Sequence, residues 1–236
     1  RRGLAVDEKG RMSRTVKFFL LVIAPMLALL LALLGFWSLP GNPTGWFLLL
    51  VGVAFTAGLI LDFAVRKKRF WKASTAPEAP QERGDRSFWF ISLGMIAVFY
   101  LSPLEYLYLF QSLPRNIWIA WIGVALSTLG VCLFVWARRI LGDDFSGHLT
   151  VKPDQNLVQI GPYRLIRHPA YAGYLSMALG ISLGYSSFLG LLSTLVLLIP
   201  GLGYRIKVEE RLLLVYFGQA YRQYASRTRR LIPGIW

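Results

Sequence analysis

Long apolar stretches without charged residues alternate with short, strongly basic segments along this chain. Phe18–Trp37 has no charged residue in 20 positions, and Asn116–Ala137 has none in 22. Trp46–Leu61 and Ser87–Leu104 are shorter uncharged stretches, which reach spanning length with their flanks. Because a transmembrane helix needs about 20 apolar residues, each stretch predicts one helix that crosses a membrane.

The longest uncharged stretch, Pro169–Tyr204, predicts two helices rather than one. It lacks Asp, Glu, Lys, Arg and His over 36 residues. A single helix of this length would extend about 54 Å at ~1.5 Å per residue, against a hydrocarbon core of ~30 Å. We therefore expect a helical hairpin that reverses near residues 184–187, with a kink near Pro200 in its second helix.

Together these stretches predict an all-α fold, an integral membrane bundle of about six transmembrane helices. The expected spans are roughly 16–37, 45–65, 87–110, 116–138, 170–185 and 188–204. A C-terminal amphipathic helix is expected on the cytoplasmic side. Residues 1–86 form an expected two-pass extension with a cytoplasmic linker, and residues 87–236 form the core. The composition agrees, with 55% hydrophobic residues and a mean hydropathy of +0.49.

The net charge of +14 is distributed very unevenly across these spans. If both termini are cytoplasmic, 25 of the 26 Lys and Arg residues lie in cytoplasmic segments, and Arg115 alone lies on the opposite face. This asymmetry is typical of the positive-inside rule, and it predicts that both termini and the polar motifs face the cytoplasm. It argues against nucleic-acid binding and favours contact with anionic membrane lipid.

The cysteine and histidine content argues against a metal or disulfide centre. Cys132 is the single cysteine and lies within an expected span, where packing is its expected role. The two histidines, His148 and His168, show neither HxxxH nor HExxH spacing, so we expect no bound metal. The chain also lacks the GxGxxG and GxxxxGK[ST] patterns of dinucleotide and P-loop sites.

Polar residues gather at both ends of the long uncharged stretch. Gly161–Tyr171 precedes it as a turn rich in aromatic, cationic and imidazole groups, and Arg205–Arg211 follows it. Both ends of a hairpin lie on the same side of the membrane, so these groups are expected to meet at the water–lipid boundary. Pro169 suits the first turn of a helix, where unpaired N–H groups favour a carboxylate ligand.

A specific series of motifs runs through this half of the chain. It comprises Leu157-Val158, Gly161-x-Tyr163, Arg167-His168-Pro169-x-Tyr171-x-Gly173, Arg205, Glu209-Glu210, Phe217-Gly218, Tyr221 and Tyr224. The series resembles the isoprenylcysteine carboxyl methyltransferase superfamily over roughly residues 116–233. Members are integral membrane enzymes that use S-adenosylmethionine, so the resemblance implies a methyltransferase core with a cytoplasmic cofactor pocket. The implied cofactor contacts are Leu157, Val158, Tyr163, His168, Pro169, Ala170, Tyr171 and Glu209.

The resemblance also points to an arginine and shows one departure from the family. Arg205 falls where the prenylcysteine enzymes place a substrate-contacting arginine. Arg167 is the second candidate catalytic residue, because Pro169 fixes the side chains of the two residues before it. The family usually has His-x-Leu-Val before the Gly-x-Tyr turn, where this chain has Gln155 in place of the histidine. Gln155 can hydrogen-bond a cofactor, but it supplies no imidazole chemistry.

Several of these residues have a plain structural alternative. Arg205 and Glu209 are one helical turn apart and could form a surface pair, although the order of cation before anion contributes at most ~0.5 kcal/mol. Tyr163 and Tyr171 could be aromatic anchors at the membrane interface, which is the role we favour for Tyr174.

The leading hypothesis is S-adenosylmethionine-dependent methyl transfer to a lipid-like or prenylated acceptor that enters from the membrane. The resemblance implies the carboxylate of a prenylated cysteine, with a phospholipid amine or a small thiol as alternatives. An NADPH-dependent reductase of the sterol type and a non-catalytic membrane scaffold are the other classes left open. A methyl group on a sulfonium is already activated, so the protein must chiefly align donor and acceptor and exclude water.

Overall fold

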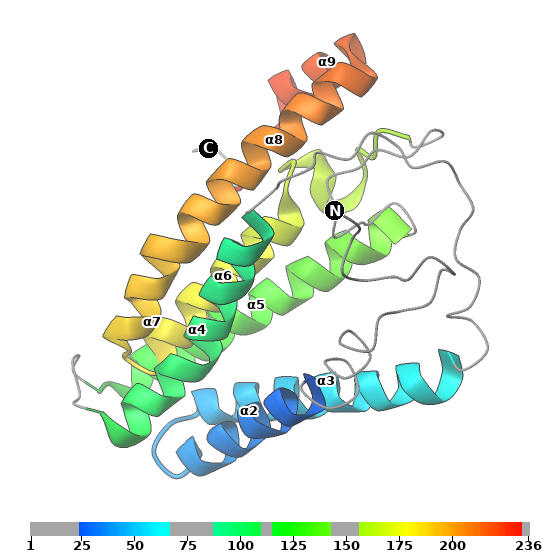
Figure 1. The fold of residues 1–236 in the computed structure, drawn as a ribbon. Helices are drawn as coiled ribbons and strands as arrows, with labels where there is room; N and C mark the ends of the chain where they lie inside the picture. The colour runs from blue at the N-terminus through cyan, green and yellow to red at the C-terminus, as the bar shows by residue number, and fades with distance from the viewer. Residues whose placement is uncertain (1–23, 67–86, 110–114, 143–155, 233–236) are drawn as a thin grey trace, which may run out of the picture.

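The computed structural model describes residues 24–66, 87–109, 115–142 and 156–232, and the regular elements within these residues are helices, as predicted, with one isolated β-bridge between Ile166 and Arg229 (Figure 1). The helices are α2 (Ala24–Ser38), α3 (Thr44–Arg66), α4 (Ser87–Tyr108), α5 (Ile117–Leu141), α6 (Pro169–Gly184), α7 (Phe188–Ser193), α8 (Ile199–Phe217) and α9 (Gln219–Arg227). Two short elements complete them: a 3₁₀ turn, η3 (Gly161–Arg164), and a π-helical turn, η4 (Thr194–Leu198).

Within the described residues, three helical segments are long and apolar enough to cross a membrane. They are Trp89–Tyr108, Ile117–Leu141 and Phe188–Phe217. Met26–Ser38 and Thr44–Ala54 are shorter apolar helices. The apolar helices agree with an integral membrane protein, while the number of six passes stays a prediction. Residues 16–23 of the first expected span lie outside the described part of the chain.

The predicted hairpin is present, and its second arm is longer than expected. α6 ends at Gly184, and Ser187 caps the returning helix by accepting a hydrogen bond from the Gly190 N–H. α7, η4 and α8 then follow one another without interruption to Phe217 (Figure 1). The arm passes residue 204 because the charged residues that follow are good helix formers, and it ends at Gly218, whose φ is 54°.

The π-helical turn lies directly before Pro200, where a kink was predicted. Proline has no N–H to donate, so the ordinary hydrogen-bond ladder is interrupted at Pro200. The Ile199 N–H reaches back five residues to the Thr194 carbonyl instead. A π turn of this kind is a recognised cause of helix distortion, so the helix is irregular beside Pro200, and the kink itself stays a prediction.

α5 and α6 approach each other closely because small residues line both facing surfaces. A Cβ added at Gly123 would lie 2.4 Å from the Cα of Gly184, and one added at Gly173 would lie 2.7 Å from the Gly130 carbonyl oxygen. Small residues at helical spacing allow such backbone contact between membrane helices. We call this contact the glycine seam. It fixes the position of α6 and therefore of the turn that precedes Pro169.

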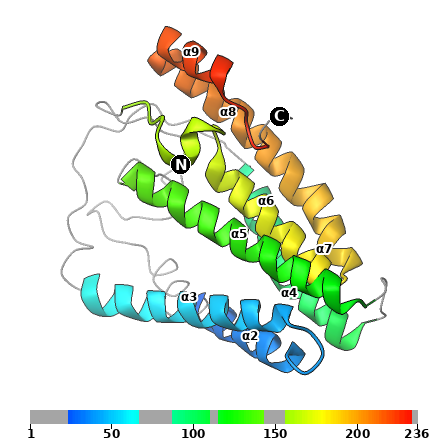
Figure 2. The ribbon, with the colours of Figure 1, turned by 180° about the vertical axis from the view of Figure 1, so that it is seen from behind.

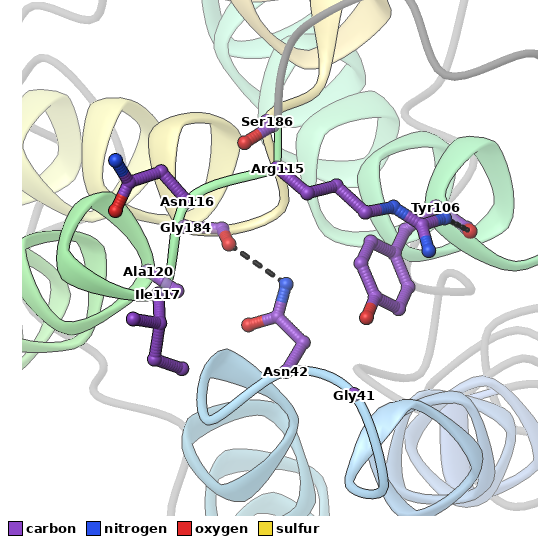
Figure 3. Close-up of a pocket in the computed structure, with 9 residues that line it drawn as sticks. All are labelled: Gly41, Asn42, Tyr106, Arg115, Asn116, Ile117, Ala120, Gly184 and Ser186. Atoms are coloured by element: carbon purple, nitrogen blue, oxygen red, sulfur yellow. Dashed lines mark hydrogen bonds between the residues drawn. The ribbon is translucent and has the colours of Figure 1, made fainter.

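The hairpin of α2 and α3 shares the core of the later helices. The Ser38 and Tyr185 hydroxyl oxygens lie 2.7 Å apart. The Asn42 amide donates to the Gly184 carbonyl at 2.8 Å (Figure 3). Leu48 is fully buried in a hydrophobic cluster to which α4 and α6 also contribute. Residues 24–66 are therefore packed against the bundle, and the proposed boundary at residue 86 stays a prediction.

A small cavity of about 90 Å³ marks the junction where this hairpin meets the turns between the later helices. Its lining residues are Gly41, Asn42, Tyr106, Arg115, Asn116, Ile117, Ala120, Gly184 and Ser186 (Figure 3). The Arg115 guanidinium donates to the Tyr106 carbonyl at 2.6 Å and lies 4.0 Å from the Tyr106 ring centroid. The Asn116 side chain caps α5. These polar groups bind the protein itself, at the far end of α6 from the Gly161–Tyr171 turn.

Candidate functional site

The turn before α6 is pinned to the end of the chain by main-chain hydrogen bonds. The Arg167 N–H donates to the Arg229 carbonyl at 2.7 Å, and the His168 N–H donates to the Arg230 carbonyl at 3.0 Å. The Arg229 N–H returns a bond to the Leu165 carbonyl at 3.2 Å. We call residues 228–231 the C-terminal strap. After α9 it turns back along α8 (Figure 2), which brings it against the turn.

Local sequence explains the shape of this turn. Gly161 has a φ of 59°, a left-handed conformation that suits glycine, and Pro162 then starts η3. The Tyr163 carbonyl accepts a 2.8 Å hydrogen bond from the Tyr224 hydroxyl of α9. Burial raises the pKa of Tyr224 to about 12, so this hydroxyl stays protonated and available as a donor at neutral pH. The turn is therefore braced by α9 as well as by the strap.

Arg205 and Glu209 are joined through a tyrosine of the other hairpin arm. The Tyr171 hydroxyl donates to Glu209 Oε2 at 2.8 Å and accepts from Arg205 Nε at 2.9 Å. Arg205 is buried at 6% exposure, whereas the Glu209 side chain is 33% exposed. A buried cation and an accessible carboxylate are thus held together by one hydroxyl. This arrangement is more than a surface pair, because it depends on a residue of α6.

His168 is buried between two carboxylates of α8. Its Nδ1 lies 3.8 Å from Glu209 Oε2, and its Nε2 lies 3.5 Å from Glu210 Oε1. The imidazole stacks on the Tyr171 ring with centroids 5.6 Å apart. Nε2 makes no hydrogen bond within the described residues. His168 therefore contacts both of the adjacent glutamates and the tyrosine that joins Arg205 to Glu209.

The second candidate arginine, Arg167, points toward α9 and the strap. Its Nε donates to Glu210 Oε1 at 2.9 Å, and its Nη1 donates to the Ala225 carbonyl at 2.9 Å and to the Thr228 carbonyl. Its side chain is only 10% exposed. The catalytic role predicted for Arg167 stays a prediction, and these contacts give the side chain a structural task beside the site.

Glu210 holds an arginine on each carboxylate oxygen. Besides Arg167 on Oε1, Arg230 approaches Oε2 with Nε at 2.9 Å and Nη2 at 2.8 Å. Glu210 lies past the apolar part of α8. Burial disfavours its charged form, but contacts from His168, Arg230 and Arg167 hold the pKa of Glu210 well below its ordinary value. The carboxylate is therefore ionised at neutral pH, which strengthens its bonds to both arginines.

The other predicted cofactor residues lie around the start of α6. Pro169 is fully buried at its first turn, and Leu157 is half-buried just before η3. The predicted residues that share one buried cluster beside α5 are Val158, Tyr163 and Ala170. Gln155 and His148 lie outside the described residues, so the structure does not place them.

Sequence reasoning missed the partners of Glu210. Arg167 and Arg230 lie 43 and 20 positions from it along the chain, and basic residues near the C-terminus were explained by the positive-inside rule alone. The position of Glu210 next to Glu209 in the Glu-Glu motif was the one signal in the sequence that could have drawn attention to Glu210. Tyr174 was expected to be an interfacial anchor, and it is partly buried with its ring 5.0 Å from that of Phe134.

Comparisons with known proteins bear on this site. The family model described as phospholipid methyltransferase matches residues 118–220. Protein-S-isoprenylcysteine O-methyltransferase B of Arabidopsis thaliana is 28% identical over 138 residues, which cover 56% of this chain and 70% of that protein. The uncharacterized protein YpbQ of Bacillus subtilis is 30% identical over 123 residues, covering 52% and 71%.

The chain belongs to the isoprenylcysteine carboxyl methyltransferase superfamily. A solved structure of the eukaryotic intramembrane Ras methyltransferase ICMT, a member of this superfamily, shares the fold. The likeness has a TM-score of 0.54 at 19% identity and covers 94% of this chain and 85% of that one. The match to the phospholipid methyltransferase family model spans α5 to the start of α9, so it includes the Gly161–Tyr171 turn, Arg205, Glu209 and Glu210.

Proposed function

We propose that this methyltransferase uses S-adenosylmethionine to methylate the carboxylate of a prenylated cysteine or a close analogue. The observation that carries the proposal is the group formed by Arg205, Tyr171 and Glu209, which places a buried cation beside an accessible carboxylate. The names of the plant relatives, which are protein-S-isoprenylcysteine O-methyltransferases, support the choice of acceptor.

The residues around the start of α6 fit the chemistry of this cofactor. The cofactor supplies, when bound, a methyl group already activated on a sulfonium. The Ala170 N–H in the first turn of α6 would donate to its carboxylate, since the Tyr171 and Ala172 N–H groups bond the His168 carbonyl. Glu209 would accept hydrogen bonds from its ribose hydroxyls or amino group. The faces of Tyr163 and Tyr171 would stabilise the sulfonium by a cation–π contact of roughly 0.5–2 kcal/mol. The buried His168 Nε2, which makes no hydrogen bond within the described residues, marks the same region as polar.

Arg205 would hold the acceptor. Its planar guanidinium matches a carboxylate, and the bond from its Nε to the Tyr171 hydroxyl fixes its orientation. Because a carboxylate is already deprotonated at neutral pH, the site needs no general base. The contribution of these residues is then to align the acceptor oxygen and to exclude water from it.

The proposed site faces the cytoplasm, with both termini on the same side. The support is the 25 to 1 distribution of basic residues across the expected spans. The acceptor would reach Arg205 laterally from the membrane, because α8 passes from an apolar stretch into the site within a single helix. Anionic lipid of the cytoplasmic leaflet would surround the basic segments.

Methyl transfer from labelled S-adenosylmethionine, measured with the full chain in lipid nanodiscs, tests the proposal. The acceptor panel contains a farnesylated N-acetylcysteine, phosphatidylethanolamine and a small alkyl thiol. We expect base-labile methyl ester to form on the farnesylated acceptor. The phospholipid methyltransferase match makes the lipid amine the second candidate, and methylation of that amine alone would replace the proposed acceptor. Oxidation of NADPH by the protein, without any methyl transfer, would overturn the proposal altogether.

A further inference from the structure

We infer that Glu210 and Arg230 are positioning residues, which clamp the C-terminal strap onto the His168 turn and so hold the methyl-transfer site in shape. The inference rests on the proposed function, since it concerns the same site. It assigns Glu210 a task different from that of its neighbour Glu209, and it gives the last described segment of the chain a part in the reaction.

Arginines occupy both carboxylate oxygens of Glu210, with Arg167 on Oε1 and Arg230 on Oε2 at 2.8–2.9 Å. The Glu210 side chain is 13% exposed, against 33% for Glu209. A carboxylate that is saturated by protein donors and mostly buried suits a structural link better than ligand binding. The accessible Glu209 is the better candidate for the ligand.

Buried side chains anchor the C-terminal strap at both of its ends. Thr228 is buried and its hydroxyl donates to the Tyr224 carbonyl at 2.8 Å. Leu231 is buried in a cluster with Ile166 and Ile206. Between these anchors, the main chain of Arg229 and Arg230 pairs with the turn. The strap is therefore part of the structure that carries His168, rather than a loose end.

His168 and Tyr171 connect the clamp to the groups proposed to bind the ligands. His168 contacts Glu210 through Nε2 and Glu209 through Nδ1, and its ring stacks on Tyr171. Tyr171 in turn holds Arg205. A displacement of the turn would therefore shift the stacked ring and the hydroxyl on which the acceptor-binding arginine depends. No residue of the strap needs to touch a ligand for this effect.

Arg230 is the residue of the clamp that can be replaced with least disturbance. Two of its guanidinium nitrogens lie on one carboxylate oxygen of Glu210, and its side chain is 35% exposed, so its replacement should not prevent folding. Arg227, at the end of α9, is exposed and provides a matched control of the same residue type. Arg230→Gln removes the clamp, Arg230→Lys retains charge, and Arg227→Gln removes an equal charge elsewhere.

Two measurements on the full chain in nanodiscs test the inference. Hydrogen exchange of peptides that include the Arg167 and His168 amides reports the pairing of turn and strap without any ligand. Calorimetric titration with S-adenosylhomocysteine reports the site. We expect Arg230→Gln to speed exchange of these amides and to weaken binding about ten-fold, as suits the loss of hydrogen bonds between charged groups. Arg230→Lys should recover part of both effects, and Arg227→Gln should match the wild type.

The outcomes separate the inference from the proposed function. Unchanged exchange and unchanged affinity in a folded Arg230→Gln protein would overturn the clamp. Faster exchange with unchanged affinity would also overturn it, because the strap would then hold the turn without affecting the site. Equal losses in Arg227→Gln would show a general charge effect instead. A wild-type chain that binds no S-adenosylhomocysteine would refute the proposed function, and with it the site that the clamp is said to hold.

Discussion

Replacing Tyr171 with phenylalanine removes one oxygen atom from the centre of the site. That oxygen donates to Glu209 at 2.8 Å and accepts from Arg205 at 2.9 Å, so two bonds to charged groups are lost together. The ring remains, and with it the stacking on His168. The substitution therefore tests the hydroxyl link and leaves the packing around it in place.

The expected loss follows from the strength of such bonds. A hydrogen bond to a charged group contributes ~1.5–3 kcal/mol, and each ~1.4 kcal/mol corresponds to a factor of about ten. The two losses will not add fully, because Arg205 and Glu209 are one helical turn apart and can approach each other once the hydroxyl is gone. We therefore expect kcat/KM for the acceptor to fall about 10- to 100-fold.

Initial rates of methyl transfer at varied acceptor and varied cofactor measure this loss, and thermal unfolding in the same nanodiscs checks the fold. Tyr174→Phe is the matched control, because that tyrosine lies one turn further along α6 and, among the described residues, does not hydrogen-bond Arg205 or Glu209. It should retain nearly the wild-type rate. A folded Tyr171→Phe protein with kcat/KM within about two-fold of the wild type would refute the importance of the link.

The remaining predictions concern four further positions. Glu209→Gln should weaken S-adenosylmethionine binding by ~1.5–3 kcal/mol in calorimetry without unfolding the protein, and unchanged affinity would remove Glu209 from the site. Arg205→Lys should raise the acceptor KM or lower kcat while cofactor affinity barely changes, because lysine lacks the planar fork; equal losses for both ligands would indicate a structural role. Gly123→Leu should lower the unfolding temperature markedly, since even a Cβ there would lie 2.4 Å from the Gly184 backbone, whereas Gly203→Ala, with no atom within 4 Å of its Cβ, should be far milder. The stability contributed by ionised Glu210 is present above the ordinary carboxyl pKa and is lost as the pH falls toward its lowered folded value. Unfolding temperatures measured from neutral pH downward should therefore fall less steeply in Glu210→Gln than in the wild type.

The hairpin was predictable from the sequence because it follows from the length of a single uncharged stretch. The 36 uncharged residues of Pro169–Tyr204 exceed any single pass, and the reversal falls within the expected residues 184–187. The end of the second arm was not predictable from charge, because a helix can leave the membrane and continue. Its true end at Phe217 is set by Gly218, a local backbone signal that the membrane argument did not consider.

The side chains that meet at the candidate site were predictable in part, while their roles stay predictions. The residue types at His168, Tyr171, Arg205 and Glu209 pointed to one site, and the structure brings these four together. What the sequence did not show is the Tyr171 hydroxyl between the two charges, 34 and 38 positions away from them along the chain. Such a contact depends on how closely α6 packs in the bundle, which the glycine seam determines. The spacing of Arg205 and Glu209 within α8 does not predict a contact with a side chain of α6.

The adjacent glutamates lie in different surroundings, which is the basis for proposing that Glu209 binds a ligand while Glu210 belongs to the scaffold. Successive side chains of an α-helix point about 100° apart, so Glu209 and Glu210 face different surroundings although they share a neighbour in His168. Glu210 is held by Arg167 and Arg230, while Glu209 and Arg205 share the Tyr171 hydroxyl. Arg205 is buried, and low polarity strengthens the interactions of its charge. If Arg205 is the acceptor contact, as proposed, it favours an anionic acceptor group over an ammonium. A carboxylate meets that requirement directly, which is the physical reason to test the prenylated cysteine before the lipid amine.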